Sequence, residues 1–387
     1  MGSSKTVFAQ ALEPLHRQVF DRCVRRYDGN LNVRTFSCRD QFLCMAFAQL
    51  AYRESLRDIE SCLRSRGEHL YRMGFRGKIS RSTLSDANET RDWRIYAGIA
   101  AALTSKARRL YSGEVLEVDL GEAVYALDAT TIDLCMNLFP WAHFRSTKSA
   151  VKLHTLLDLR GNIPTFIDIT PGKKHDVHVL DKIDFEPGAF YIMDRGYLDF
   201  ARLYFMHLDS AFFVIRAKKN LDFVRHSSQP IDTATGVRSD HIGRLGGKFE
   251  VYPENLRRVR FHDENQLRFL VFLTNNMTLP AHVIAQLYKM RWQVELFFKW
   301  IKQHLRIKSF FGTSANAVKT QVWIAISAYV LVAILKKQLG LEPSLHRILQ
   351  VLSVSLFEQV PIPELFTETH YREDGNDSCN QLTLWDF

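Results

Sequence analysis

Four side chains suited to phosphate chemistry lie within one short segment, YKMRWQVELFFKWIKQHL at residues 288–305. Their spacings of three, four and seven positions bring them onto one face of a helix with 3.6 residues per turn. A second line with steps of three and four is wholly apolar and predicts the buried face. The polar set is Tyr288, Arg291, Glu295 and Lys302, and the apolar set is Leu287, Met290, Val294, Phe297 and Ile301. Taken alone, the pattern favours an exposed helix with an ordinary Arg291–Glu295 contact.

Two aspartates at predicted strand ends supply further acidic groups. Asp128 closes a β run in YALDAT, and Asp194 closes another in YIMDRGY. Such carboxylates, joined by Glu295 from a helix packed on the sheet, can converge on one point, where they repel each other unless cations lie between them. Hard divalent ions meet this need, and two ions about 3.5–4 Å apart can drive phosphodiester cleavage. The three acids therefore predict a two-metal site that acts on phosphodiesters.

The same residues carry a resemblance to a known family. The helix spells Y-(2)-R-(3)-E-(6)-K, which resembles the signature of the cut-and-paste DDE transposases of bacterial insertion sequences, family four. The stretches ALDATTIDL, KLHTLLDLRGNIPTFIDIT, GKKHDVHVL and MDRGYLD are similar to the blocks that carry the first two aspartates there. The resemblance covers roughly residues 30–340. It implies a ribonuclease-H-like catalytic core with a β-rich insertion between the second and third acids.

The resemblance also implies roles for these residues. Asp128, Asp194 and Glu295 would hold two Mg²⁺ (or Mn²⁺) ions and cut double-stranded DNA at the ends of the element before it is joined to target DNA. Phosphate contacts to the element end would come from Tyr288, Arg291, Lys302 and, directly after Asp194, Arg195. A homodimer is expected in the DNA-bound synaptic complex.

In that family the first strand is cut by water, and the freed 3′-hydroxyl attacks the other strand to leave a hairpin. One base is flipped out and held by an aromatic residue of the insertion. No tryptophan lies between Trp141 and Trp292 here, so Phe223, Phe249 or Tyr252 would have to hold it.

Positive charge gathers at the N-terminal end. Residues 1–110 hold 20 lysines and arginines against 11 acidic residues, which equals the net charge of +9 of the whole chain. Seventeen of these cations are arginines, which suit forked phosphate contacts. Predicted helices and the basic loop RMGFRGKISRS make residues 1–110 a predicted helical DNA-binding domain. Arg76, Lys78 and Arg81 of that loop are candidate DNA contacts.

The remaining elements predict an α/β class. Strands alternate with helices from residue 115, with a hairpin turn at residues 160–162 and a short helix from Asp176. Short β runs and glycine-rich turns predict the insertion at about residues 215–275, and helices then continue to about 359. We therefore expect a catalytic domain over 115–360 and a polar C-terminal tail over 361–387.

Targeting and cysteine patterns point to a cytoplasmic, nucleoid-associated bacterial protein. No signal peptide and no paired cysteine motif is present, and the six cysteines fit a reducing compartment. The longest apolar run, 323–335, has 13 residues and predicts a core helix rather than a membrane span. No membrane partner is expected.

Several alternatives remain open. Asp133 is interpreted as a turn or helix-start residue, and His154 as a hydrogen-bonded residue of the core or near the site. His175, Asp176 and His178 are interpreted as a helix start rather than a metal site. For the whole protein, a structure-selective nuclease with the same core is disfavoured by the basic N-terminal part. A catalytically inactive DNA-binding relic is disfavoured by the three intact acids.

Overall fold

The computed structural model describes residues 5–145, 148–247, 250–264, 267–305, 307 and 310–367. The helices are α1 (Val7–Ala11), α2 (Arg17–Arg26), α3 (Cys38–Leu50), α4 (Leu56–Arg64), α5 (Gly67–Leu70), α6 (Arg81–Thr90), α7 (Arg94–Tyr111), α8 (Phe200–Leu208), α9 (Ala281–Met290), α10 (Trp292–His304), α11 (Ala315–Gln338) and α12 (Leu345–Ser355). The strands are β1 (Val124–Leu134), β2 (His143–Arg145), β3 (Lys148–Asp158), β4 (Ile163–Pro171), β5 (Phe190–Met193), β6 (Phe212–Arg216), β7 (Phe223–Ser228), β8 (Val237–Leu245), β9 (Leu256–Asp263) and β10 (Arg268–Thr274). The predicted α/β class is confirmed.

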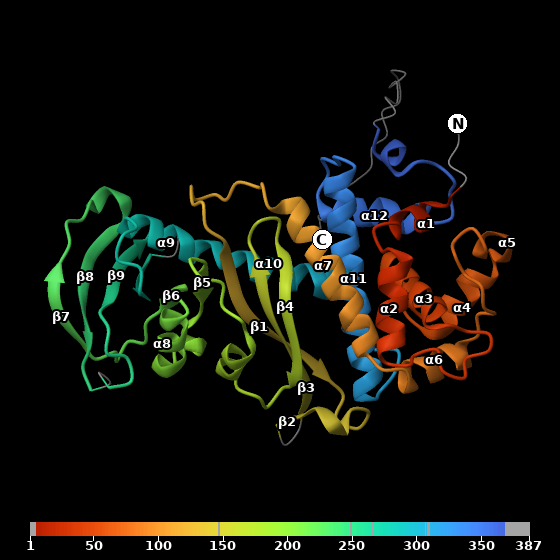
Figure 1. Cartoon of the computed structure of the whole chain (residues 1–387), viewed down its shortest axis with the longest axis horizontal. Coiled ribbons are helices and arrows are strands. Elements are labelled where there is room, and N and C mark those ends of the chain that lie inside the picture. The colour runs from red at the N-terminus through yellow and green to blue at the C-terminus, as the bar shows by residue number, and fades with distance from the viewer. Residues whose placement is uncertain are drawn as a thin grey trace, which may run out of the picture.

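One mixed sheet runs through most of the molecule. Its strand order is β2-β3-β1-β5-β6-β10-β9-β8-β7, and β4 pairs with β3 on the edge opposite β1, as β2 does. The pairs β1–β5 and β5–β6 are parallel, whereas the remaining neighbours are antiparallel. Strands β7–β9 form one end of the molecule and the N-terminal helices lie at the other end (Figure 1).

The β-rich segment predicted at about 215–275 is present as β7 to β10. Its last strand, β10, pairs with β6, the strand that precedes the segment. The segment therefore continues the central sheet instead of forming a separate one.

The hairpin between β3 and β4 turns where the sequence predicts it. Gly161 and Asn162 both have positive φ, at 78° and 56°, a conformation that glycine and asparagine tolerate best. Asp158 closes the turn by accepting a hydrogen bond from the Arg160 amide at 3.0 Å. This turn returns β4 alongside β3 and leaves β3 free to pair with β1.

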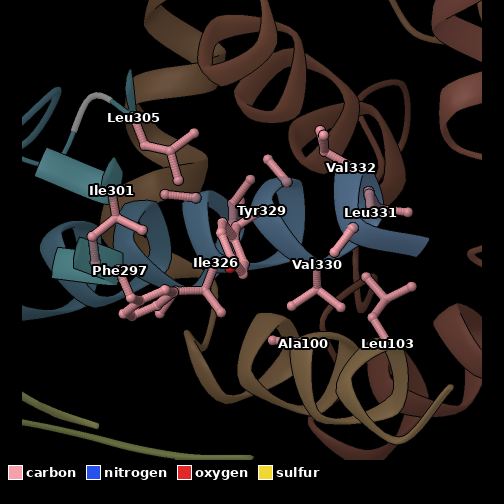
Figure 2. Packing of buried hydrophobic residues seen from close by; sticks show 14 of the residues in the cluster. Ala100, Leu103, Phe297, Ile301, Leu305, Ile326, Tyr329, Val330, Leu331 and Val332 are labelled. Atoms are coloured by element: carbon pink, nitrogen blue, oxygen red, sulfur yellow. The ribbon is translucent and has the colours of Figure 1, made fainter. Parts of the chain in front are cut away.

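A buried helix joins the sheet to the N-terminal helices. Helix α11 contains the predicted core run and packs against both α7 and α3. Its apolar window, with a mean hydropathy of 1.8, is long enough to cross a membrane, but 89% of that window is buried inside the protein. Figure 2 shows Ile326, Tyr329 and Val330 of this helix between Ala100 of α7 and Phe297 of α10. The prediction of a core helix is confirmed.

Helix α3 begins at the predicted cap. Ser37 accepts a hydrogen bond from the Asp40 amide, and the Asp40 carboxylate accepts one from the Ser37 amide, which completes a capping box. Nearly all of α3 is buried, so the hydrophobic core runs without interruption from the N-terminal helices into α11 and α12.

Strand β1 is longer than predicted. The sequence predicts an end near Asp128, but β1 stays paired with β3 as far as Leu134. Asp133 is accordingly a strand residue opposite Ala150, not a turn or helix-start residue. Its prediction was wrong because β3 is long enough to pair with the whole polar half of β1.

Candidate active site

Asp128 and Asp194 lie side by side at one edge of the parallel part of the sheet. Strands β1 and β5 are paired up to Leu127 and Met193, and each aspartate is the next residue of its chain segment. The carboxyl ends of adjacent parallel strands meet at the same edge. The two carboxylates therefore start from neighbouring backbone positions, as the sequence predicts, although β1 itself continues beyond Asp128.

The helix with the spaced polar residues is divided into two helices. Helix α9 ends at Met290, and α10 begins at Trp292. Arg291 between them keeps helical dihedral angles (φ −52°, ψ −29°), and its amide bonds to the Tyr288 carbonyl in a tightened turn. The prediction of one unbroken helix was wrong at this residue, but the chain keeps its direction.

The apolar face of α9 and α10 is buried as predicted. All five residues of the apolar line are at most 7% exposed, and they are Leu287, Met290, Val294, Phe297 and Ile301. Tyr288 is also buried, with its ring 4.6 Å from that of Phe272. The apolar face is therefore wider than the sequence suggests and includes the ring of Tyr288.

Burial of this face gives a stability prediction. Replacing Met290, which is 7% exposed, with alanine should lower the free energy of unfolding by about 2–5 kcal/mol, because a cavity is left in the core. Leu296, which is 41% exposed on the same helix pair, is the control, and its replacement by alanine should cost no more than about 0.5 kcal/mol. Chemical denaturation of both variants measures the difference, and equal losses would contradict the assigned faces.

Arg291 links two of the three acids. One guanidinium nitrogen donates to Asp128 Oδ2 at 2.7 Å, and another donates to Glu295 Oε1. These side chains are largely shielded, with 16% of Arg291, 22% of Asp128 and 34% of Glu295 exposed. Arg291 is thus the cation between Asp128 and Glu295.

Asp194 has a different partner. The Tyr288 hydroxyl donates to Asp194 Oδ1 at 3.2 Å. Burial, followed by the neighbouring Asp194 charge among other groups, raises the pKa of Tyr288 to about 12, so the hydroxyl keeps its proton as a donor. Tyr288 therefore orients the second acid from α9.

Electrostatics show that the acids lie near one another. Burial is the largest cause that raises the pKa of Asp128 to about 6, and the charges of Glu295 and Asp194 contribute in the same direction. The Arg291 charge and the hydrogen bond from the Ala129 amide act in the opposite direction. The pKa of Asp128 is thus raised mainly because the carboxyl is buried, and the charges of all three neighbouring groups reach it.

Lys302 contacts the strand that contains Asp128, and Arg195 follows Asp194 in the chain. Lys302 Nζ donates to the Thr131 carbonyl of β1 at 2.9 Å, so this lysine reaches across the sheet edge from α10. Arg195 directly follows Asp194 and is exposed. The predicted N-terminal contacts Arg76, Lys78 and Arg81 are also exposed, but they belong to the loop before α6 and to its first residue.

The three aromatic candidates for holding a base differ in accessibility. Tyr252 is fully buried and its hydroxyl lies 2.7 Å from His207 Nδ1. Phe223 is half-buried at the start of β7, and Phe249 lies outside the described residues. Tyr252 is therefore a core residue, and Phe223 is the accessible candidate of these two.

His154 and Asp176, outside the acidic cluster, have structural partners. His154 is buried, with Nε2 2.9 Å from the Thr170 hydroxyl, which confirms its interpretation as a hydrogen-bonded core residue. Asp176 begins a 3₁₀ helix (Asp176–Lys182) as predicted, and its carboxylate accepts from Lys152 Nζ at 2.9 Å. His175 precedes that helix but forms no capping hydrogen bond through its side chain.

Two features of the site were not predicted from the sequence. The Arg291–Glu295 spacing gives an i,i+4 contact but does not reveal the bond to Asp128, which is 163 positions away. Tyr197 has a buried hydroxyl, and burial and then the charges of acids including Asp128 and Asp194 raise its pKa well above the usual value. Its position three residues after Asp194 was the available signal.

Comparison with known proteins decides the family. Residues 119–331, more than half of the 387-residue chain, match the family model of the transposase DDE domain. The chain belongs to the DDE transposase family. The match includes Asp128, Asp194 and Glu295 within its bounds.

The transposase is also similar to curated relatives. It is 34% identical over 284 residues to the "Putative transposase y4zB" of Sinorhizobium fredii, covering 71% of this chain and 77% of that protein. It is 33% identical over 207 residues (53% and 54%) to the "Probable transposase for insertion sequence element IS5377" of Geobacillus stearothermophilus. A third relative, the "Putative transposase for insertion sequence element IS4SA" of Synechocystis, is 25% identical over 279 residues (68% and 74%). The predicted insertion-sequence DDE transposase is confirmed, and its assignment to family four remains a prediction.

A second family model matches the N-terminal part. Residues 3–76 of the transposase match a domain of unknown function. This match ends within the loop that carries Arg76 and Lys78.

Proposed function

We propose that this transposase binds the inverted-repeat ends of an insertion sequence, cuts them by metal-dependent hydrolysis and transesterification, and joins them to target DNA. The observation that carries the proposal is the grouping of Asp128, Asp194 and Glu295 at one sheet edge, where Arg291 bridges Asp128 and Glu295. Family membership supports strand cleavage and transfer as the chemistry.

The strand order supports a ribonuclease-H-like core. From one edge, β4, β3 and β1 are antiparallel neighbours, and β5 and β6 continue in parallel with β1. Asp128 then lies on β1 and Asp194 directly after its neighbour β5, and the third acid comes from a helix packed on β1. The segment β7–β10 falls between the second and third acids, where the resemblance implies an insertion.

The acids fit a pair of hard divalent ions. The three side chains supply only carboxylate oxygens, which Mg²⁺ and Mn²⁺ favour. The pKa of Asp128 is raised mainly by burial, with smaller contributions from the charges of Glu295 and Asp194. Across the described ranges, no three histidine, cysteine or acidic side chains are arranged for joint metal ligation, and Arg291 lies between Asp128 and Glu295. We propose that Arg291 leaves this position when Asp128, Asp194 and Glu295 hold the ions. Bound there, two ions would supply activation of the attacking oxygen and stabilisation of the leaving oxygen.

The chain's own residues have complementary tasks. Tyr288 holds the Asp194 carboxylate in place through its hydroxyl. The forked guanidinium of Arg291 suits a phosphate once it leaves the acids, because it can donate two parallel hydrogen bonds. Lys302 and Arg195 would hold neighbouring phosphates of the element end and so fix the scissile bond against the acids.

Partners follow from the same proposal. Double-stranded DNA is the substrate, both as element end and as target, and a homodimer would hold two ends in the synaptic complex. If a hairpin forms, Phe223 is the proposed residue for holding a flipped base. The cytoplasm and the nucleoid are the proposed location.

A cleavage assay tests the proposed function. The full-length transposase should release a 3′-hydroxyl at the junction of a linear duplex that carries the element end, and only with Mg²⁺ or Mn²⁺. Binding without cutting would favour the inactive relic. Cutting of branched DNA with no preference for the element end would favour the structure-selective nuclease.

A further inference from the structure

Two buried hydroxyl groups near the acidic cluster have no hydrogen-bond partner in the part of the chain that the structure describes. They are Thr155 Oγ1 and the hydroxyl of Tyr197, and the two residues are 0% and 2% exposed. Most buried polar side-chain atoms in proteins do have a partner. A hydroxyl removed from water without one destabilises the folded state, so its position requires an explanation.

Thr155 stands opposite Asp128 in the sheet. Strands β1 and β3 run side by side (Figure 1), and their antiparallel register pairs Asp128 with Thr155. Directly opposite residues of an antiparallel pair point to the same face, with their Cβ atoms about 4.5–5.5 Å apart. The preceding pair, Leu127 and Leu156, points to the other face and belongs to a separate hydrophobic cluster. Asp128 and Thr155 thus share the face on which α10 packs.

Tyr197 lies on the opposite face, in the turn that follows β5. It ends the 3₁₀ helix (Arg195–Tyr197) directly after Asp194, and its amide donates to the Asp194 carbonyl at 3.0 Å. Its ring belongs to the same hydrophobic cluster as Leu127. Strand β5 is paired with β1 only as far as Leu127, so this turn continues from the point where the edge of β1 beside Asp128 loses its neighbouring strand.

The charges that act on Tyr197 indicate where its hydroxyl points. Burial raises the pKa of Tyr197 well above its usual value, and the largest charge that adds to this rise is that of Asp128. Asp176 and Asp194 act in the same direction, whereas Arg291 acts in the opposite one. The hydroxyl therefore keeps its proton and lies within range of the Asp128 carboxylate as a hydrogen-bond donor.

In this structure Asp128 is held by Arg291. Its Oδ2 accepts from the Arg291 guanidinium at 2.7 Å, and its Oδ1 accepts from the Ala129 amide at 2.8 Å. Asp194, by contrast, already has the Tyr288 hydroxyl as a donor. Carboxylates that ligate a metal are usually held by further hydrogen bonds. When Arg291 turns to a phosphate, as the proposed function requires, Asp128 needs another side-chain donor.

We propose that Thr155 and Tyr197 are positioning residues of the active site, whose hydroxyls hold the Asp128 carboxylate once Arg291 has left it. The inference rests on the proposed function, because it takes Asp128 to be a metal ligand. It explains two hydroxyls that are buried without a partner beside the same acid. Both side chains act through Asp128 and need no contact with the DNA or the ions.

The test is Mn²⁺ binding by the full-length protein, measured from the electron paramagnetic resonance signal of the free ion. Thr155→Val and Tyr197→Phe each remove a hydroxyl and keep the shape of the side chain. Each should bind Mn²⁺ roughly tenfold more weakly than wild type, as is usual when a hydrogen-bond partner of a metal ligand is lost. Thr155→Ser keeps the hydroxyl and should retain most of the affinity. Asp128→Asn defines the relevant binding, because only the component that it removes belongs to the acidic site.

Stability in EDTA separates positioning from a structural role. Thr155→Val and Tyr197→Phe should keep or raise the melting temperature, because each removes a buried group without a partner. The matched controls are Thr104→Val and Tyr329→Phe, whose buried hydroxyls donate to backbone carbonyls at 3.3 and 2.9 Å. These controls should lower the melting temperature and leave the Mn²⁺ affinity unchanged.

The outcomes separate this inference from the proposed function. Wild-type Mn²⁺ affinity in both Thr155→Val and Tyr197→Phe overturns the inference, and the proposed function stands if the wild type cuts element ends. A weaker affinity accompanied by a fall in melting temperature as large as that of the controls also overturns it, because a structural role then suffices. If the wild type has no Mn²⁺ binding that Asp128→Asn removes, the proposed metal site fails and the inference fails with it. If both variants lose affinity as expected but the wild type never cuts, the inference stands and the transposition chemistry fails.

Discussion

Replacing Glu295 with glutamine is expected to abolish metal-dependent strand cleavage while leaving the DNA affinity of the transposase intact. Glutamine keeps the size of the side chain but loses the charge that faces Arg291 and that would ligate the proposed ions. We expect cleavage to fall by about a thousandfold or more, equivalent to about 4 kcal/mol of transition-state stabilisation. Affinity for the element end should not fall, because removing a negative charge next to phosphates weakens repulsion.

The control is Glu342→Gln, which makes the same change at an exposed residue between α11 and α12. It should cut and bind like wild type. Cleavage by Glu295→Gln at a rate within tenfold of wild type would remove Glu295 from the metal site, even if Asp128 and Asp194 remained essential.

Replacing Arg291 with alanine should destabilise the metal-free protein and increase the rise in melting temperature that metal causes. The variant leaves Asp128 and Glu295 without the cation that now pairs with both. Because these groups are only partly shielded, we expect a loss of about 1–3 kcal/mol of unfolding free energy in EDTA. Without a competing guanidinium, Mn²⁺ should raise the melting temperature of the variant more than that of wild type.

Arg291→Lys is the comparison, because it keeps the charge but cannot bridge two carboxylates with a planar fork. In EDTA, the unfolding free energy of Arg291→Lys should lie between those of Arg291→Ala and wild type. Both variants should cut poorly, because the proposed contact of Arg291 with a phosphate is lost. A melting temperature of Arg291→Ala equal to wild type, with the same Mn²⁺ shift, would show that Arg291 acts on DNA alone. The sequence alone predicts that result, with the free energy of unfolding of Arg291→Ala within about ±0.5 kcal/mol of wild type.

Structural features that depend on local sequence patterns were predicted correctly. The cap at Ser37, the turn at Gly161 and Asn162, and the apolar line on α9 and α10 all depend on residues within one or two turns of each other. Such contacts are fixed by side-chain type and spacing, so they can be predicted without tertiary information.

Long-range pairing could not be predicted in the same way. The length of β1 depends on how far β3 runs beside it, and the sequence near Asp128 contains no sign of that. The inserted strands continue the central sheet because β10 pairs with β6. Both are choices of partner between distant segments, and each strand's own sequence is compatible with several partners.

The acidic cluster was predictable in its members but not in its internal pairing. Asp128, Asp194 and Glu295 come from motif spacing, and the first two meet because β1 and β5 are parallel neighbours. The bridge from Arg291 to Asp128 needs the angle at which α9 and α10 cross the sheet, which no local pattern encodes. The sequence therefore indicated Arg291 only as a DNA contact and did not reveal its bond to Asp128.

The most direct test of the central claim is a crystal structure of the transposase bound to its element end with Mn²⁺, using anomalous scattering to locate the metal. We predict two manganese peaks about 3.5–4 Å apart, ligated by Asp128, Asp194 and Glu295, with Arg291 turned from the acids to a phosphate. The claim would be contradicted if the peaks lay elsewhere, or if Arg291 still bridged Asp128 and Glu295 with no metal beside them.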